Sequence, residues 1–392
     1  MLEKVIRARK QLSEMTEGSG FRVFAGFDGF VDAIVRPISE HDTYGNHAYF
    51  STIAEFGKYL QGKARKGCSI ELSRELRKSG GNAFLFADAL AGMGIETTCV
   101  GAFGYPQVMD VFARNHQNLK LVSIGAPGQC SALEFSDGKV MLSDNSEINE
   151  MDYRLLETRI GEERLVRYVE GADILAFMNW SELRGCSDIW RGFLENIFPQ
   201  VRSGERKRMF LDLSDCSCRG RTDILDMLGL IRSFSRYFAV TLSLNANEFQ
   251  ATGEILTLDE APVGNGGATG KEAEMARRIR EYCGLESLFI HLPDRAYGMD
   301  GEKEACVMTR FIKEPNCSTG GGDNFNAGLL FGLIHGLDME SAMVVGNAAS
   351  GYYVTHGHSA SRAEIADYLL NWEQELVMDG TQATGEDVSI SS

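Results

Sequence analysis

Residues 320–323, Gly-Gly-Gly-Asp, combine the features of an anion site with a potential base. They precede the predicted helix 324–334, whose apolar residues cover most of its circumference, so we expect this helix to be buried. The first N–H groups of a helix have no partner within it, and the helix dipole adds about half a positive charge there. Such an end binds phosphate. Asp323, in the first turn, is placed to take a proton from a hydroxyl that attacks phosphorus. The alternative is an ordinary N-cap after a tight turn, although a cap needs only one aspartate and one glycine.

Three more groups of polar residues lie at the ends of predicted elements. They are Gly80, Gly81 and Asn82 before the predicted helix 83–93, Asn245 and Glu248 after the predicted strand 238–243, and Asp28 and Asp32 after the predicted strand 22–27. A glycine pair before a helix, or Asn and Glu after a strand, also form ordinary helix caps, so each motif alone is weak. A carboxylate at such a position suits Mg²⁺, which keeps several of its waters.

The four segments, in this order, resemble the motifs of the ribokinase-like family, also called the phosphofructokinase B family of carbohydrate kinases. Residues 317–330, CSTGGGDNFNAGLL, resemble its C-terminal signature; residues 80–94, GGNAFLFADALAGMG, its N-terminal glycine pair; and residues 245–248, NANE, its N-x-x-E motif. The resemblance implies a three-layer α/β/α sandwich with a mainly parallel central sheet and a small β lid. It also implies transfer of the terminal phosphoryl group of a nucleotide, ATP, to a hydroxyl of a sugar.

The resemblance assigns a role to each motif residue. Asp323 is the expected catalytic base, and the amides of Gly320, Gly321 and Gly322 are the expected anion hole. The sugar is expected to contact Asp28, favoured because it is nearer to the strand end, together with Asp32, Gly80, Gly81 and Asn82. Nucleotide contacts are expected from Asn245, Glu248, His291, Arg295, Thr319 and Asn347, and Glu248 and Asn245 are expected to hold Mg²⁺ through water.

The chain departs from the family pattern at three places. Cys317 replaces an aspartate, which removes the carboxylate of the family's monovalent-cation site, and Leu85 stands where relatives commonly carry an asparagine. Residues 291–296, HLPDRA, replace Thr-x-Gly-x-x-Gly, so His291 or Arg295 would have to contact phosphates through side chains. Two alternatives therefore stay open: a nucleoside kinase, and a ligand-binding or regulatory protein without turnover.

Alternating apolar and amphipathic segments supply the elements that must position these residues. Strands are predicted at 22–27, 97–101, 173–177, 209–213, 238–243 and 288–292, and helices at 83–93, 188–201, 223–234 and 271–282. Near-continuous apolar strands between helices are typical of a parallel sheet covered on both faces. Residues 33–52 and 128–145 break this pattern and are predicted to form the β lid, although they could be two unrelated surface excursions. The kinase domain is expected to span 1–378, with a disordered tail at 379–392.

Composition excludes several functions. The 392-residue chain has a net charge of −16, which repels nucleic acid and anionic membrane surfaces. It has no run of about 18 apolar residues and no apolar signal segment at its N-terminus. Nine cysteines without C-x-x-C pairs indicate a reducing compartment, so we expect a cytoplasmic protein. Relatives often pair through their lids, which makes a homodimer the expected assembly.

Overall fold

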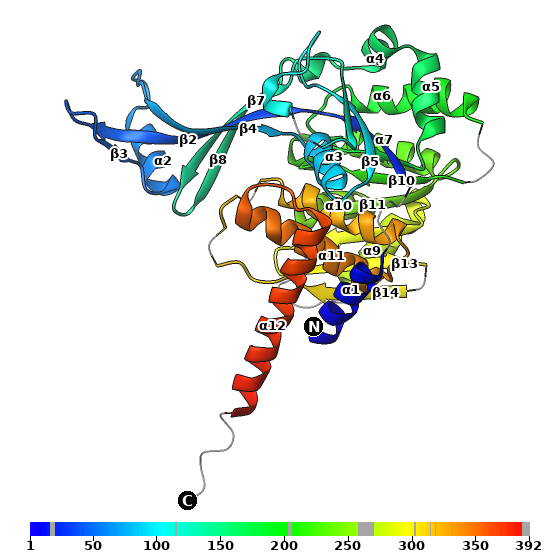
Figure 1. Ribbon diagram of the computed structural model, residues 1–392. Helices are drawn as coiled ribbons and strands as arrows, with labels where there is room; N and C mark the ends of the chain where they lie inside the picture. Colours follow the sequence, from blue (N-terminus) through cyan, green and yellow to red (C-terminus); the bar gives the residue numbers. More distant parts are fainter. Residues whose placement is uncertain are drawn as a thin grey trace, which may run out of the picture.

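The computed structural model describes residues 1–15, 20–113, 116–202, 206–257, 270–301, 303–313, 315–317 and 319–385 (Figure 1). Its strands are β1 Arg22–Phe27, β2 Phe30–His41, β3 His47–Tyr49, β4 Leu72–Gly80, β5 Glu96–Gly101, β6 Leu119–Ser123, β7 Gly128–Phe135, β8 Gly138–Asp144, β9 Ile174–Phe177, β10 Arg208–Asp212, β11 Ala239–Asn245, β12 Ser287–His291, β13 Arg295–Asp300 and β14 Lys303–Met308. Its helices are α1 Leu2–Glu14, α2 Ile53–Gly62, α3 Asn82–Gly92, α4 Tyr153–Ile160, α5 Glu162–Gly171, α6 Cys186–Gly192, α7 Arg221–Phe234, α8 Ala246–Thr257, α9 Gly270–Cys283, α10 Gly321–Ile334, α11 Met339–His356 and α12 Arg362–Gly385.

The main body is built on a large sheet of mostly parallel strands. In the described part of the chain this sheet has nine strands in the order β14-β13-β12-β11-β10-β9-β1-β5-β6. All neighbours from β12 to β6 are parallel, and β13 and β14 add an antiparallel edge. The six predicted strands are confirmed within two residues, because their apolar runs are buried on both faces.

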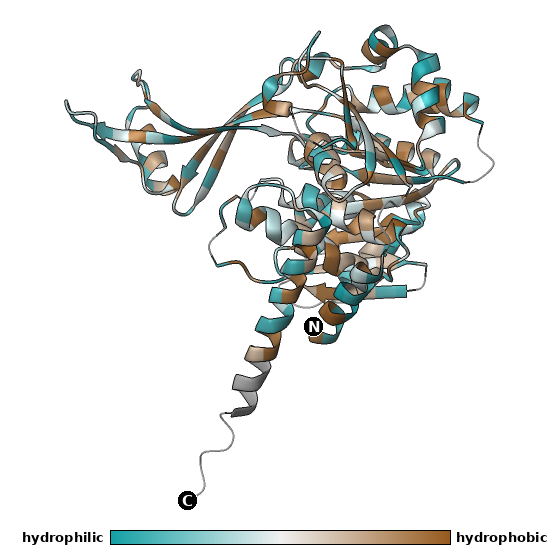
Figure 2. Ribbon diagram, in the orientation of Figure 1, coloured by the Kyte–Doolittle hydropathy of each residue, from teal (hydrophilic) through white to brown (hydrophobic). Residues whose placement is uncertain are grey.

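Helices cover both faces of this sheet and make three layers. Along β1, Phe24 packs into a hydrophobic cluster with helices α4 to α9, whereas Val23 and Ala25 pack into a second cluster with α1, α3, α10, α11 and α12. Successive side chains of a strand point to opposite faces, which is why one strand serves both clusters. Figure 2 shows the hydrophobic residues concentrated in this sheet and in the helices against it.

The predicted β lid is confirmed as a separate sheet, and it contains a strand that the sequence did not reveal. Its order is β3-β2-β7-β8, with β4 paired to β2. In Figure 1 it extends to the left, away from the main body. Helix α2 covers one face of the lid through a small cluster that includes Val35, Phe50, Phe56 and Leu133. Strand β4, LSRELRKSG, was not predicted because its charged residues hide any apolar alternation.

Two further elements differ from expectation. The predicted helix 188–201 is α6 followed by a π-helical turn at Phe193–Ile197 and a 3₁₀ turn at Phe198–Gln200. Helix α12 continues to Gly385, past the expected domain boundary at residue 378, and residues 386–392 lie outside the described part of the chain. Within the described ranges, no helix is long and apolar enough to cross a bilayer.

Candidate active site

The polar residues of the predicted motifs meet at the carboxyl ends of the parallel strands. Asp28 follows β1, Asp212 ends β10, Asn245 ends β11 and His291 ends β12. Parallel strands present these ends at one edge of the sheet, where ligands bind in open α/β folds. A cavity of about 310 Å³ lies there, and its wall includes Asp32, Gly81, Asn82, Asn245, Glu248, His291, Thr319, Gly320, Gly322 and Asp323.

The N-terminus of α10 opens into this cavity without a side-chain cap. Gly320, the N-cap, has a φ of +100°, which favours glycine. A Cβ there would also lie 2.8 Å from the Tyr353 hydroxyl and 2.9 Å from Leu85 Cδ1. The next two residues, Gly321 and Gly322, form the first turn of the helix and leave their amides free of a side-chain acceptor. The glycine turn therefore has the features of an anion site at the end of a buried helix.

Asp323 is the third residue of α10, and its side chain lies on the cavity wall. It is 7% exposed. Burial raises its pKa well above the usual value, and the charges of Asp212, Asp28 and Glu182 raise it further. A raised pKa makes this carboxylate a better proton acceptor near neutral pH.

The two aspartates after β1 have different positions. Asp28 is fully buried and accepts hydrogen bonds from the backbone N–H groups of Asn82 (2.9 Å) and Ala83 (2.7 Å) and from Asn179 Nδ2 (2.7 Å). It therefore fixes the start of α3, and burial raises its pKa to about 7. Asp32, on β2, lines the cavity instead, and burial raises its pKa to about 6. The geometry thus favours Asp32 over Asp28 for direct contact with a ligand.

The glycine pair makes room for this arrangement. A Cβ on Gly80 would collide with the carboxylate of Asp32. Gly81 has a φ of +96° and packs so closely on the turn between β1 and β2 that a Cβ would lie 2.8 Å from Gly29 Cα. Asn82 lines the cavity and donates from Nδ2 to Asp212 Oδ1 (3.2 Å).

Asn245 and Glu248 cap helix α8 and also face the cavity. The Glu248 carboxylate accepts hydrogen bonds from the backbone N–H and the side-chain amide of Asn245, and the Glu248 N–H donates to Asn245 Oδ1 (3.0 Å). Burial raises the pKa of Glu248 well above its usual value, and the charge of Asp212 raises it further. Among the described residues, no group of three or more His, Cys, Asp or Glu side chains is arranged to hold a metal ion directly.

The other expected nucleotide residues lie at different distances from the cavity. His291 lines it, packs against Phe325 and is held neutral, because burial lowers its pKa to about 4. Thr319 also lines it. Arg295 begins β13, is buried and bonds to Asp294 (3.0 Å), and it contacts Glu272 at 3.7 Å. Asn347 is buried on α11, where its amide donates to the Met308 carbonyl oxygen (3.4 Å). The structure therefore brings His291 and Thr319 to the anion site and places Arg295 and Asn347 outside the cavity wall.

The comparison with protein families decides what kind of protein carries this site. The family model described as prokaryotic ketohexokinase matches residues 2–372. The chain belongs to this family. It is therefore a carbohydrate kinase, which transfers a phosphoryl group to a sugar hydroxyl.

Known relatives agree with this assignment. The kinase is 27% identical to a ketohexokinase of Haloferax volcanii over 93% of this chain and 95% of the relative. It is 24% identical to an uncharacterized sugar kinase, YegV, of Escherichia coli over 74% of this chain and 82% of the relative. Its fold is similar to that of Thermotoga maritima ribokinase, with a TM-score of 0.59, 14% identity and coverage of 89% of this chain and 98% of the other. It is also similar to Arabidopsis thaliana ribokinase complexed with ribose and ATP, with a TM-score of 0.60, 14% identity and the same two coverages. The ribokinase-like fold is thus confirmed.

Several residues of the kinase's cavity were missed by the sequence motifs. They are Glu182, Asp212, Ser214 and Asp215 on the wall, with Asn179 and Asn326 behind them. Asn179 and Asp212 lie at the carboxyl ends of predicted strands, so the strand-end rule would have revealed them. Asn326 donates from Nδ2 to Asp212 Oδ2 (2.9 Å), a contact between segments 114 positions apart that no local pattern shows.

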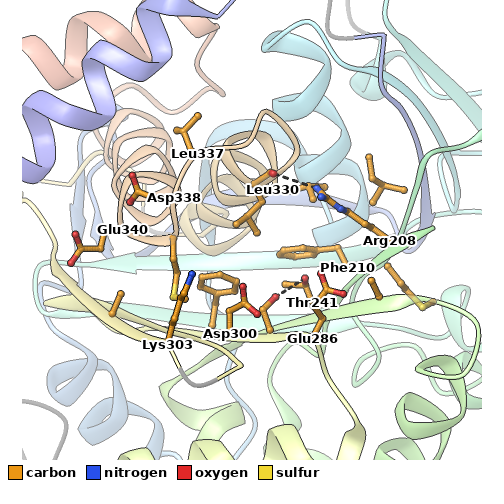
Figure 3. A pocket seen from close by; sticks show the side chains of 18 of the residues that line it. Arg208, Phe210, Thr241, Glu286, Asp300, Lys303, Leu330, Leu337, Asp338 and Glu340 are labelled. Carbon is orange, nitrogen blue, oxygen red and sulfur yellow. Dashed lines mark hydrogen bonds between the residues drawn. The ribbon is translucent and has the colours of Figure 1, made fainter. Parts of the chain in front are cut away.

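A second cavity lies at the opposite ends of the same strands (Figure 3). It has a volume of about 520 Å³ and is enclosed by Arg208, Phe210, Thr241, Leu330 and Leu337 among others. It is larger than the cavity at Asp323, but it meets the carboxyl-terminal part of α10, where the helix dipole is negative. A phosphate site is therefore favoured at the other end of this helix, beside Asp323.

Proposed function

We propose that this carbohydrate kinase transfers the terminal phosphoryl group of ATP to a hydroxyl of a ketohexose. The family description and the Haloferax volcanii relative support a ketohexose as acceptor, and the ATP complex of the Arabidopsis thaliana ribokinase supports ATP as donor. The observation that carries the proposal is the position of Asp323. Asp323 and the uncapped N-terminus of α10, at Gly320 and Gly322, line the same cavity as Asp32.

Each group of cavity residues has its own role in the proposed reaction. Asp32 and Asn82 form hydrogen bonds with the sugar, while Asp28 holds the start of α3 beneath them. Asp323 removes the proton of the attacking hydroxyl and keeps it on a carboxylate oxygen. The hydroxyl oxygen forms a bond to the terminal phosphorus as the bond to the leaving ADP oxygen breaks. The Gly321 and Gly322 amides stabilise the charge on the transferring group, so positioning and electrostatics do the catalysis.

Mg²⁺ fits the acidic side of this cavity. Glu248 and Asn245 already bond to each other, so they suit a cation held through water, and Asp212 and Asp215 lie on the same wall. When bound there, the ion neutralises charge on the nucleotide phosphates. It would also relieve the repulsion that raises the pKa of Glu248.

We extend the proposal to the remaining contacts and to assembly. Thr319 and His291 lie on the wall beside the glycine turn and contact the nucleotide there, His291 as a neutral ring. Arg295 and Asn347 contact the nucleotide outside this cavity. Two copies of the chain pair through their lids.

A substrate panel tests the proposal. Phosphate transfer from ATP with Mg²⁺ is measured by ADP release with ketohexoses, aldohexoses, pentoses and nucleosides, and turnover is expected to be highest with a ketohexose. Asp323→Asn should lower kcat by about two to four orders of magnitude while sugar affinity stays within a few-fold. Asp338→Asn, at the N-cap of α11, is the control and should keep its turnover. Equal turnover in the wild type and Asp323→Asn would refute the assignment of the base, and turnover with nucleosides alone would refute the sugar.

A further inference from the structure

The cavity that must bind several phosphate charges is lined by acidic residues. Asp32, Glu182, Asp212, Asp215, Glu248 and Asp323 lie on its wall. Among the described residues of this wall there is no lysine or arginine, and its histidine, His291, is neutral at pH 7. The two free amides of α10 carry only partial charges. Apart from the proposed Mg²⁺, positive charge for the nucleotide phosphates would therefore have to come from groups just behind the wall.

Two lysines of the lid reach the segment that leads into α10. Lys78, on β4, donates from Nζ to Cys317 Sγ (2.8 Å) and to the Tyr353 hydroxyl (3.3 Å). Lys139, at the start of β8, donates to Thr319 Oγ1. Thr319 is the residue before the N-cap Gly320, and Tyr353 is the ring against which Gly320 packs. Lys139 therefore contacts the residue next to the expected anion hole, and Lys78 contacts a side chain that packs against it.

The direct hydrogen-bond partners of these lysines are not carboxylates. In the part of the chain that the structure describes, the hydrogen-bond acceptors of Lys78 and Lys139 are a thiol, a phenol and a hydroxyl. Carboxylates act on the lysines only through longer-range charge interactions, Asp32 on both and Glu134 on Lys139. Burial raises the pKa of Tyr353 to about 12, so the phenol is neutral. Burial lowers the pKa of Lys139, the charges of Cys317 and Glu134 oppose that effect, and repulsion by Lys78 adds to it. Two like charges held together beside free amides fit a site that is completed by an anion.

We propose that Lys78 and Lys139 are positioning residues that supply the positive charge of the phosphate site. Because both belong to the lid, the site is complete only when the lid lies against the glycine turn. This rests on the proposed function in so far as the anion is the phosphate chain of the nucleotide. The competing explanation is that the two lysines only fasten the lid to the main body, with no effect on phosphate.

Nucleotide affinity separates the two explanations without any need for turnover. Calorimetry on the full chain with Mg²⁺ compares ADP, which carries phosphates, with adenosine, which carries none. Lys78→Gln and Lys139→Gln should each weaken ADP binding about tenfold or more, as expected for a hydrogen bond or close contact that involves a charge. Adenosine affinity should change less than twofold. Lys78→Arg and Lys139→Arg, which keep the charge, should recover most of the ADP affinity.

Arg77→Gln is the matched control, because Arg77 is the exposed neighbour of Lys78 on β4 and its loss removes the same charge from the lid. It should leave ADP affinity unchanged. Equal losses for ADP and adenosine, the same loss in Arg77→Gln, or no loss at all would overturn the proposal and leave the lysines as lid fasteners. Lys→Met variants, which keep the aliphatic stem, replace any Gln variant that fails to fold. Absence of phosphate transfer to every sugar would refute the proposed function alone, since the ADP and adenosine comparison would still decide the role of the lysines.

Discussion

At the scale of single residues, the site is a group of carboxyl groups whose pKa values are raised together. Burial is the largest cause for Asp28, Asp32, Asp212, Glu248 and Asp323. Their mutual repulsion adds to the effect. Perturbed pKa values of this kind cluster at functional sites. In the reaction that we propose, this crowding raises the proton affinity of Asp323, and Mg²⁺ neutralises the charge of the other carboxylates.

The acid limb of the pH–rate profile should move when Asp212 is neutralised. Asp323 must be ionised to act, so kcat/KM falls as the pH drops through its raised pKa. After burial, the charge of Asp212 is the largest cause of that raised pKa. Asp212→Asn should therefore shift the acid limb to lower pH. Asp215→Asn is the control, since Asp215 lies on the same wall but is not among the causes of the raised pKa of Asp323. A limb that is unchanged in Asp212→Asn would contradict the assignment.

Asp32 should make the stability of the ligand-free enzyme depend on pH. Its folded-state pKa of about 6 exceeds the value of about 3.9 expected for an unfolded chain. This carboxyl therefore contributes stability below about pH 4 that is lost as the pH rises to about 7. Asp32→Asn removes the titration, so its free energy of unfolding should improve relative to the wild type over that range. Urea unfolding at a series of pH values measures the difference, and a difference that stays constant would show that Asp32 does not titrate there.

At the scale of elements, the proposed reaction depends on helix α10 and the glycine turn before it. The chain must enter the helix at a positive φ, pack Gly320 against Tyr353 and leave the first amides of the helix without a side-chain cap, which explains why one glycine does not suffice. The opposite end of α10 has a glycine of the same kind, Gly336, with a φ of +78° and open space around it. The two positions thus differ in contacts and share their backbone conformation.

Gly320→Ala and Gly336→Ala form a matched pair of variants. Both place a Cβ in the left-handed region, which costs about 1 kcal/mol of stability. Only Gly320→Ala also pushes against Tyr353 and Leu85, so it should displace the turn and lower kcat by about tenfold or more. Gly336→Ala should lower the melting temperature with little change in kcat. Thermal unfolding and initial rates on the two proteins test this, and similar kcat losses in both would mean that the close contact at Gly320 is unimportant.

Most elements that hold the site could be predicted from the sequence, and those that complete it could not. Apolar runs such as Met209–Leu211 identify buried parallel strands because both faces are covered. Strand β4 was not predicted because most of its side chains are exposed, so its sequence shows no apolar alternation. The hydrogen bond from Lys78 to Cys317 could not be predicted either, because the two residues lie 239 positions apart. Asp28 was favoured over Asp32 on distance from the strand end, whereas burial under α3 makes it a structural acceptor.

At the scale of the whole molecule, the lid is a sheet whose described strands leave β4 and β8 each paired on one side only. Strand β4 pairs only with β2 in the described structure, and its Leu72 and Leu76 side chains are 43% and 53% exposed. Exposed apolar side chains on an unpaired edge strand favour association with another chain. The lid's position away from the main body leaves room for this contact (Figure 1).

We therefore expect a homodimer in solution that depends on β4. Light scattering after size-exclusion chromatography should give about twice the 43.2 kDa mass of one chain. Leu72→Glu combined with Leu76→Glu places two like charges on each edge, so desolvation and repulsion should convert the dimer to monomers. Leu370→Glu is the control, because Leu370 is also partly exposed, at 38%, but lies on α12 in the main body. A wild type that runs as a monomer, or a dimer that survives the double substitution, would show that β4 is not the contact.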